Sequence, residues 1–251
     1  MLMMVLNKKK LKKIGIWVGI LTIIILMIGF GFKLVKGGTF PTSGLFDSTQ
    51  LPYTQGTKGN SGYVALTCNV DLGWETEYVE SILDTLKKED VKITFNVTGR
   101  WAEKNQDMLL RIKSEGHEIG NHGHRHLDYA HLSYEENLEQ ITTSKKIIED
   151  IIKEETKFFQ APSGSFGKDT VEAAKKLGYI SIKWDIDTID WQNREEPDVI
   201  IKRIQGKKMK DGSIVLMHPT NATAQCVDDI IKIVRDNGFK PGKLSDIFIV
   251  E

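Results

Sequence analysis

From residue 63 to the end of the chain, short apolar stretches alternate with amphipathic ones, and this alternation constrains the fold more than any other feature. Apolar, β-rich stretches predict strands at 63–70, 91–97, 117–120, 158–160, 181–184 and 213–217. Apolar residues at helical spacing predict helices at 75–88, 101–115, 133–155, 168–177, 197–205 and 223–236. The pattern predicts a parallel sheet or a closed α/β barrel, in which catalytic side chains gather at the carboxyl ends of the strands.

The N-terminal part has a different character. Five lysines between positions 8 and 13 precede an uncharged apolar run, 14–32, which is long enough to cross a membrane as a helix. Lysines on that side favour a cytoplasmic N-terminus and an exported remainder. A cleaved signal peptide has the same order, but no small-x-small site follows the run. A buried core helix fits poorly beside five lysines without an amphipathic face.

We therefore expect four segments. Residues 1–13 form a cytoplasmic basic tail, 14–32 a single-pass anchor in the cell membrane, 33–62 a flexible linker rich in Gly, Ser, Thr and Pro, and 63–251 an extracytoplasmic domain. Charge is balanced, with 34 basic and 34 acidic residues, so we expect no nucleic-acid partner. Cys68 and Cys226 could form a disulfide in an exported protein, but two cysteines make no framework, and we prefer two buried thiols.

Histidines give the sharpest chemical signal. Five of the six lie between His117 and His131, in a run that begins Gly-His-Glu-Ile-Gly-Asn-His at position 116. The glycines favour a loop after a short strand, where two imidazoles can converge on one metal ion. A solvated histidine-rich loop, or structural histidines, is the alternative on spacing alone. A helical His-Glu-x-x-His metalloprotease site is disfavoured because Gly123 follows Gly120.

Several carboxylates and one further histidine follow predicted strands. Asp71 follows the first strand, Asp187 and Asp190 follow the strand at 181–184, and His218 ends the strand at 213–217. Considered singly, each carboxylate is more often a helix cap or a surface charge than a catalytic base. His218 alone is more often a buried histidine that bonds the backbone.

The chain from about residue 63 resembles the polysaccharide deacetylase family, also described as NodB-homology domains and carbohydrate esterase family 4. The motifs that carry the resemblance occur in the family's order: VKITFNVTG at 91–99, GHEIGNH at 116–122, APSG at 161–164, DTIDW at 187–191 and LMH at 216–218. Each motif is weak alone, but five in order on matching strand ends are specific. The resemblance implies a distorted (β/α) barrel of the deacetylase type that removes N-acetyl groups from a polysaccharide.

The resemblance also implies a role for each matching residue. A divalent metal, which we expect to be Zn²⁺, would be held by His122 and His126 of an H-x-x-x-H loop. An aspartate at the end of the first strand would act as general base, and His218 would protonate the departing amine. Metal and a backbone donor would together stabilise the oxyanion.

Other matching residues would bind substrate or brace the catalytic groups. Leu216 would line the acetyl pocket, the backbone N–H of Ser163 would help hold the oxyanion, and the bracing motif would comprise Asp187, Asp190 and Trp191.

The first motif departs from the family's Thr-Phe-Asp-Asp, in which the first Asp is the base and the second a metal ligand. If Thr67-Cys68-Asn69 matches it, the base is an asparagine. If Asn69-Val70-Asp71 matches it, Asp71 is the base and Leu72 replaces the metal aspartate. We prefer the second register because it keeps the spacing to the next helix. Asp71 could then double as a metal ligand.

A second departure places Gln160 where the family has an arginine that orients the base, so the positive charge of that arginine is lost.

Two functions are compatible with these residues. The first is metal-dependent removal of N-acetyl groups from N-acetylglucosamine or N-acetylmuramic acid in peptidoglycan or a chitooligosaccharide-like glycan. The alternative is a catalytically impaired homologue that binds glycan without cleaving it. We favour the enzyme because Asp71, His122, His126 and His218 are all present.

Overall fold

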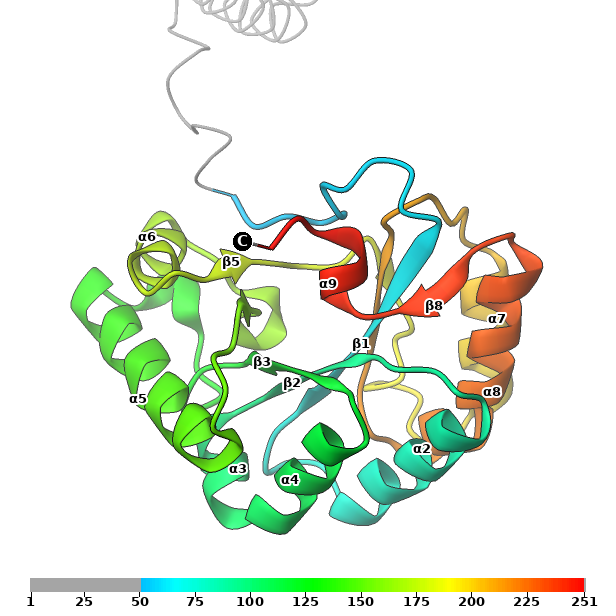
Figure 1. Cartoon of the computed structure of the whole chain (residues 1–251), viewed down its shortest axis with the longest axis horizontal. Coiled ribbons are helices and arrows are strands. Elements are labelled where there is room, and N and C mark those ends of the chain that lie inside the picture. The colour runs from blue at the N-terminus through cyan, green and yellow to red at the C-terminus, as the bar shows by residue number, and fades with distance from the viewer. Residues whose placement is uncertain (1–50, 251) are drawn as a thin grey trace, which may run out of the picture. The chain divides into compact units, whose positions relative to one another are not determined.

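A computed structural model of the chain describes residues 51–250 (Figure 1). Its centre is an eight-stranded sheet in the order β5-β4-β3-β2-β1-β7-β6, with β8 paired to the beginning of β1. All strand pairs in the sheet are parallel. The strands are β1 (Tyr63–Val70), β2 (Thr94–Val97), β3 (Glu118–Asn121), β4 (Phe158–Phe159), β5 (Ile180–Ser181), β6 (Ile186–Asp187), β7 (Ile214–Met217) and β8 (Lys240–Gly242). Since β5 and β6 end this order unpaired with each other, the described part is an open half-barrel, not a closed one.

Most of the helices lie along the outer rim of the sheet, as Figure 1 shows, and the short helix α9 (Leu244–Ile247) lies inside that rim beside β1. The helices are α2 (Thr76–Lys88), α3 (Gly99–Lys104), α4 (Gln106–Ser114), α5 (Tyr134–Ile152), α6 (Lys168–Lys176), α7 (Pro197–Gln205), α8 (Asn221–Asp236) and α9 (Leu244–Ile247), with short 3₁₀ turns at Tyr129–His131 and Pro162–Gly164. The parallel strand–helix order confirms the predicted α/β class. The sequence pattern did not predict β6, β8 or α9, which are very short.

Strand β1 lies at the centre because nearly its whole length is apolar or small and buried. Its neighbours β2 and β7 pair with it in register, Cys68 opposite Phe95 and Met217. Side chains from β1, β2 and β7 meet the apolar faces of α2, α4 and α8 in one hydrophobic core. Burial of this apolar surface fixes where the carboxyl ends of the strands, and hence the polar residues that follow them, come together.

One predicted helix is broken. The pattern predicted a helix at 101–115, but α3 and α4 are separated at Asn105, whose φ of −126° and ψ of 46° are not helical. The Asn105 side chain donates to the carbonyl of Trp101 at 3.0 Å, so it satisfies a carbonyl at the end of α3. A capping box at the start of α5, formed by Ser133 and Glu136, is as the sequence predicted.

Residues 51–62, the described part of the segment predicted as a linker at 33–62, pack on the domain. The backbone of Tyr53 bonds Ser181 and Lys183 at 2.9 and 2.7 Å, and Gly56 donates to Gly212 at 2.8 Å. A Cβ on Gly56 would lie 2.5 Å from the carbonyl oxygen of Ile247, so a glycine there permits the close approach. Glycine-rich composition suggested flexibility, yet Gly56 permits close packing.

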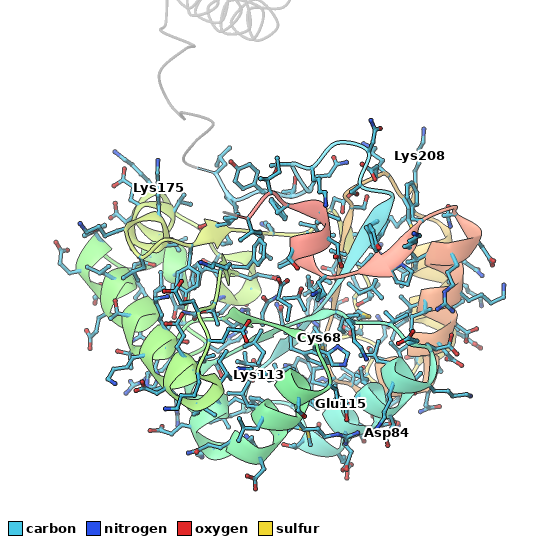
Figure 2. All side chains as sticks on the ribbon, in the orientation of Figure 1. Cys68, Asp84, Lys113, Glu115, Lys175 and Lys208 are labelled. Carbon is cyan, nitrogen blue, oxygen red and sulfur yellow. The ribbon has the colours of Figure 1, made fainter. Side chains whose placement is uncertain are left out.

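The predicted tail at 1–13, the anchor at 14–32 and residues 33–50 lie outside the described residues. Within 51–250, no helix is both long and apolar enough to span a bilayer. Both cysteines are buried and unbonded, as the preferred interpretation predicted. In Figure 2 Cys68 lies inside the domain, whereas the labelled charged residues lie on its helices and loops.

Candidate active site

A pocket of about 440 Å³ lies at the carboxyl ends of the strands. Its walls combine residues that the sequence singled out with others that it did not; they are Asn69, Trp74, His126, Ser163, Trp184, Asp187, Trp191, Arg194, Leu216 and His218. The pocket therefore gathers side chains from strand ends and loops that are far apart in the sequence, as expected for a parallel sheet.

His218 follows β7 and is held by a buried carboxylate. Its Nδ1 donates to Asp190 at 2.7 Å, and its backbone N–H donates to the other oxygen of Asp190 at 2.6 Å. Thr223 adds a third bond to the same carboxylate at 2.7 Å. Asp190 is fully buried, so these donors compensate for its loss of water. With Nδ1 engaged, Nε2 is the nitrogen free to exchange a proton in the pocket.

The two histidines of the H-x-x-x-H loop lie side by side. His122 is buried, and its Nδ1 donates to the carbonyl of Gln160 at 2.6 Å, which leaves the Nε2 lone pair free. Burial, aided by the neighbouring His126, lowers the pKa of His122 to about 3, so its imidazole is neutral. The two rings are 5.8 Å apart between centroids, and His126 Nε2 lies 3.6 Å from Asp71 Oδ2.

Two imidazoles and a carboxylate have the donor chemistry that zinc prefers. Within residues 51–250, however, no three His, Cys, Asp or Glu side chains already stand in a metal-binding arrangement. The donor set of His122, His126 and Asp71 fits a metal in its chemistry and in the free nitrogen of His122, but its three side chains are not yet gathered around one point.

The histidine loop has the predicted non-helical form. Gly123 has a φ of +76°, and a Cβ there would lie 1.8 Å from the hydroxyl oxygen of Tyr129. Asn121 accepts from the Gly123 N–H at 2.8 Å and from Ser144 at 2.7 Å. These contacts fix the turn that carries His122 out of β3 toward His126.

The end of β1 places Asn69 in the pocket. Asn69 is 3 % exposed and lines the cavity, whereas Asp71 is not among the lining residues. Asp71 lies in the turn after β1, where its Oδ1 accepts from the N–H of Gly73 and its Oδ2 faces His126. Asn69, the base position of the first register, therefore lines the cavity, and Asp71, the base of the preferred register, lies beside His126 outside the lining residues. On a continuous extended strand, residues 69 and 71 would point to the same face, so the sequence pattern could not separate them.

Asn69 belongs to a buried cluster of three amides. The Nδ2 of Asn96 donates to Asn69 Oδ1 at 2.9 Å and to Gln160 Oε1 at 2.7 Å. Asn96 Oδ1 and Gln160 Nε2 find no partner among the described residues. The cluster is neutral throughout, so nothing in it charges or polarises a base beside the pocket.

The remaining predicted residues surround the same cavity. Leu216 is 2 % exposed and Trp191 is 45 % exposed. Ser163 has a φ of +54°, an uncommon left-handed conformation for a side-chain-bearing residue. Asp187 ends β6, and its Oδ1 accepts from the N–H of Ile189 at 2.8 Å.

Sequence reasoning missed Trp74, Trp184, Arg194 and the role of Asn96. Large aromatic side chains beside strand ends are a usable signal for a binding loop, and Trp74 and Trp184 both carry it.

Comparison with known proteins agrees with this geometry. The family model "Polysaccharide deacetylase" matches residues 57–182. The uncharacterised protein YlxY of Bacillus subtilis (strain 168) is 34 % identical over 190 residues, which cover 76 % of this chain and 59 % of YlxY. The chain thus spans under two thirds of that relative. The peptidoglycan-N-acetylglucosamine deacetylase of Bacillus cereus is 31 % identical and covers 75 % of this chain and 69 % of the relative.

Among solved structures, the carbohydrate esterase family 4 pseudoenzyme BA3943 of Bacillus anthracis superposes with a TM-score of 0.71 at 37 % identity. The match covers 76 % of this chain and 68 % of BA3943. A BA3943 mutant with restored enzymatic activity matches equally, with a TM-score of 0.71 at 36 % identity over 76 % of this chain and 70 % of the mutant. With the matching model, the open parallel barrel and the strand-end histidines together, the chain belongs to the polysaccharide deacetylase family.

Proposed function

We propose that the chain binds an N-acetylated glycan of the bacterial cell wall and removes its N-acetyl groups slowly, in a metal-dependent reaction. The observation that carries the proposal is His218, which lines the pocket with its ring oriented by the buried Asp190. Peptidoglycan deacetylases among the relatives support the substrate class. The low rate follows from Asn69, an amide where a base must accept a proton.

Each of the residues around the pocket has its own proposed role. The free Nε2 of His218 delivers a proton to the departing amine, and Asp190 keeps the donating tautomer in place. Trp191 and Leu216 line the cavity where a sugar ring and its acetyl group would lie. Ser163 lines the same cavity, and its backbone N–H is the donor that we propose for the carbonyl oxygen of the acetyl group.

Zn²⁺ is the metal we propose, held by His122, His126 and Asp71. When bound, the metal supplies a polarised carbonyl and a more acidic water. The neutral state of the buried His122 suits this role, because only an unprotonated imidazole nitrogen can bind the ion.

Acetate release tests the proposal. The full-length chain, purified in detergent, is incubated with peptidoglycan and with chitooligosaccharides, with zinc or with a chelator. We expect slow acetate release that zinc supports and the chelator stops, and its loss in His218→Gln. His131→Ala is a matched control, because that histidine is exposed in a surface turn and pairs with Asp128. Acetate release that survives His218→Gln would contradict the assigned role.

A second function, glycan binding without cleavage, is favoured by the neutral amide cluster of Asn69, Asn96 and Gln160. The likeness to the BA3943 pseudoenzyme supports it as well. It predicts saturable binding of the same glycans with no acetate under any metal condition. Absence of both acetate and glycan binding would exclude both functions.

We further propose that residues 14–32 anchor the chain in the cell membrane with the domain outside the cytoplasm. Membrane fractionation of cells expressing the full chain, with added protease on intact cells, tests this. The domain is expected in the membrane fraction and accessible to the protease; a version lacking 14–32 is expected to leave that fraction.

A further inference from the structure

Arg194 is the one arginine among the residues that line the pocket. Its guanidinium carbon lies 4.4 Å from the centre of the Trp74 ring, a cation–π stack. Trp74 in turn packs against the imidazole of His218, with ring centroids 5.1 Å apart. The guanidinium is therefore held in a layered stack that ends at the proposed proton donor.

The two Nη atoms of Arg194 are available to a ligand. Among the described residues, Arg194 has no ion pair, and its one side-chain bond is a long one of 3.4 Å from Nε to the carbonyl of Trp191. Arg111, by contrast, pairs with Glu80 and Asp84 on α2 and with Glu115 at the end of its own helix. A stacked, oriented and uncompensated guanidinium at the edge of an open cavity is arranged to accept an anion from outside.

We propose that Arg194 makes the site selective for glycan that carries a carboxylate, rather than for neutral amino-sugar polymer; this rests on the proposed glycan binding. A guanidinium recognises a carboxylate through two parallel hydrogen bonds, which a neutral hydroxyl cannot match. The stack on Trp74 fixes the plane of the fork before the ligand arrives, so little rotamer freedom is lost on binding. Asp187, the carboxylate among the lining residues, already accepts from the backbone of Ile189.

Two carboxylates of a wall glycan have this chemistry: the lactyl group of N-acetylmuramic acid and the free end of a peptide stem attached to it. The ligands tested are a disaccharide of N-acetylglucosamine and N-acetylmuramic acid, its lactyl methyl amide, a stem-peptide muropeptide and diacetylchitobiose. Dissociation constants are measured calorimetrically on the full-length chain in detergent, for the wild type and for Arg194→Gln, Arg194→Lys and Arg100→Gln. Arg100 on α3 is exposed and outside the pocket, so its variant is the matched control.

We expect the free acid to bind at least about tenfold more tightly than its methyl amide or diacetylchitobiose. Arg194→Gln should remove that preference and leave diacetylchitobiose within about twofold of the wild type, while Arg194→Lys keeps part of it. Tight binding of the muropeptide, lost in Arg194→Gln, would assign the contact to the peptide carboxylate and support the same residue. Equal binding of acid and amide by the wild type would overturn the inference and leave glycan binding intact. Binding of none of the four would overturn it together with the proposed function.

Discussion

The neutral amide cluster of Asn69, Asn96 and Gln160 leads to a quantitative prediction for a catalytic base introduced at position 69. Asn69→Asp places a carboxyl group at a position that is 3 % exposed, where Asn96 donates a single hydrogen bond. Burial without a positive partner favours the protonated acid and raises its pKa. Gln160→Arg, introduced with it, places a guanidinium on the far side of Asn96.

Asn69 and Gln160 are each one hydrogen bond from the same Asn96 nitrogen. For charges about 5 Å apart at an effective dielectric of about 20, Coulomb attraction is roughly 3 kcal/mol. That corresponds to a fall of about 2 pH units in the pKa of the new carboxyl group. At neutral pH the double variant should therefore hold about 10- to 100-fold more ionised base than Asn69→Asp alone.

The assay is acetate release from peptidoglycan between pH 5 and 9 in the presence of zinc. We expect Asn69→Asp to gain activity mainly at high pH, and the double variant to reach its plateau about 2 pH units lower. Gln160→Arg alone should be inactive and destabilised by roughly 3 kcal/mol or more, since it buries an unpaired charge. Asn60→Asp, on an exposed loop, controls for the substitution itself. Identical pH profiles for the single and double variants would refute the reasoning.

Three further predictions concern single residues. Asp190→Asn should lower the rate of any acetate release by about 100-fold or more, while the affinity for glycan stays within about twofold. The substitution changes the tautomer of His218 but leaves the residues that line the cavity in place. An equal loss of affinity would argue against a carboxylate that only orients His218. Gly123→Ala should destabilise the fold by about 2 kcal/mol or more in denaturant titration. The φ of Gly123 is positive, and a Cβ at this position would collide with Tyr129. Unchanged stability would show that the loop can rearrange. Burial lowers the pKa of His117 to about 4, below its unfolded value near 6.5, so between these pH values the unfolded chain binds more protons and the stability of the fold falls as the pH drops. His117→Gln should reduce the dependence of the unfolding free energy on pH by up to roughly 1.4 kcal/mol per pH unit in this range. An unchanged pH dependence would assign the acid sensitivity to another group.

Local pattern predicted much of the fold. The alternation of apolar and amphipathic stretches predicted the parallel α/β class, the central strand Tyr63–Val70 and the long helix that Ser133 caps. These follow from hydrophobic periodicity and from hydrogen bonds between residues near in sequence, which single-chain reasoning can evaluate. The motif order likewise placed His218 and Leu216 at one cavity, since parallel strands end at one edge of the sheet.

Tertiary structure decided what depends on contacts between distant segments. Residues 51–62 have a linker's composition, yet bonds to residues more than a hundred positions away hold them on the domain. Asn69 and Asp71 are two positions apart in the sequence, but β1 ends between them at Val70. The turn after β1 brings Asp71 to His126 and leaves Asn69 in the pocket. The stack of Arg194 on Trp74 joins two loops that no local periodicity relates. Sequence by itself determined the longer elements and the chemical groups that are available. The packing of the elements determined which of these groups face one another, because that depends on the three-dimensional course of the turns.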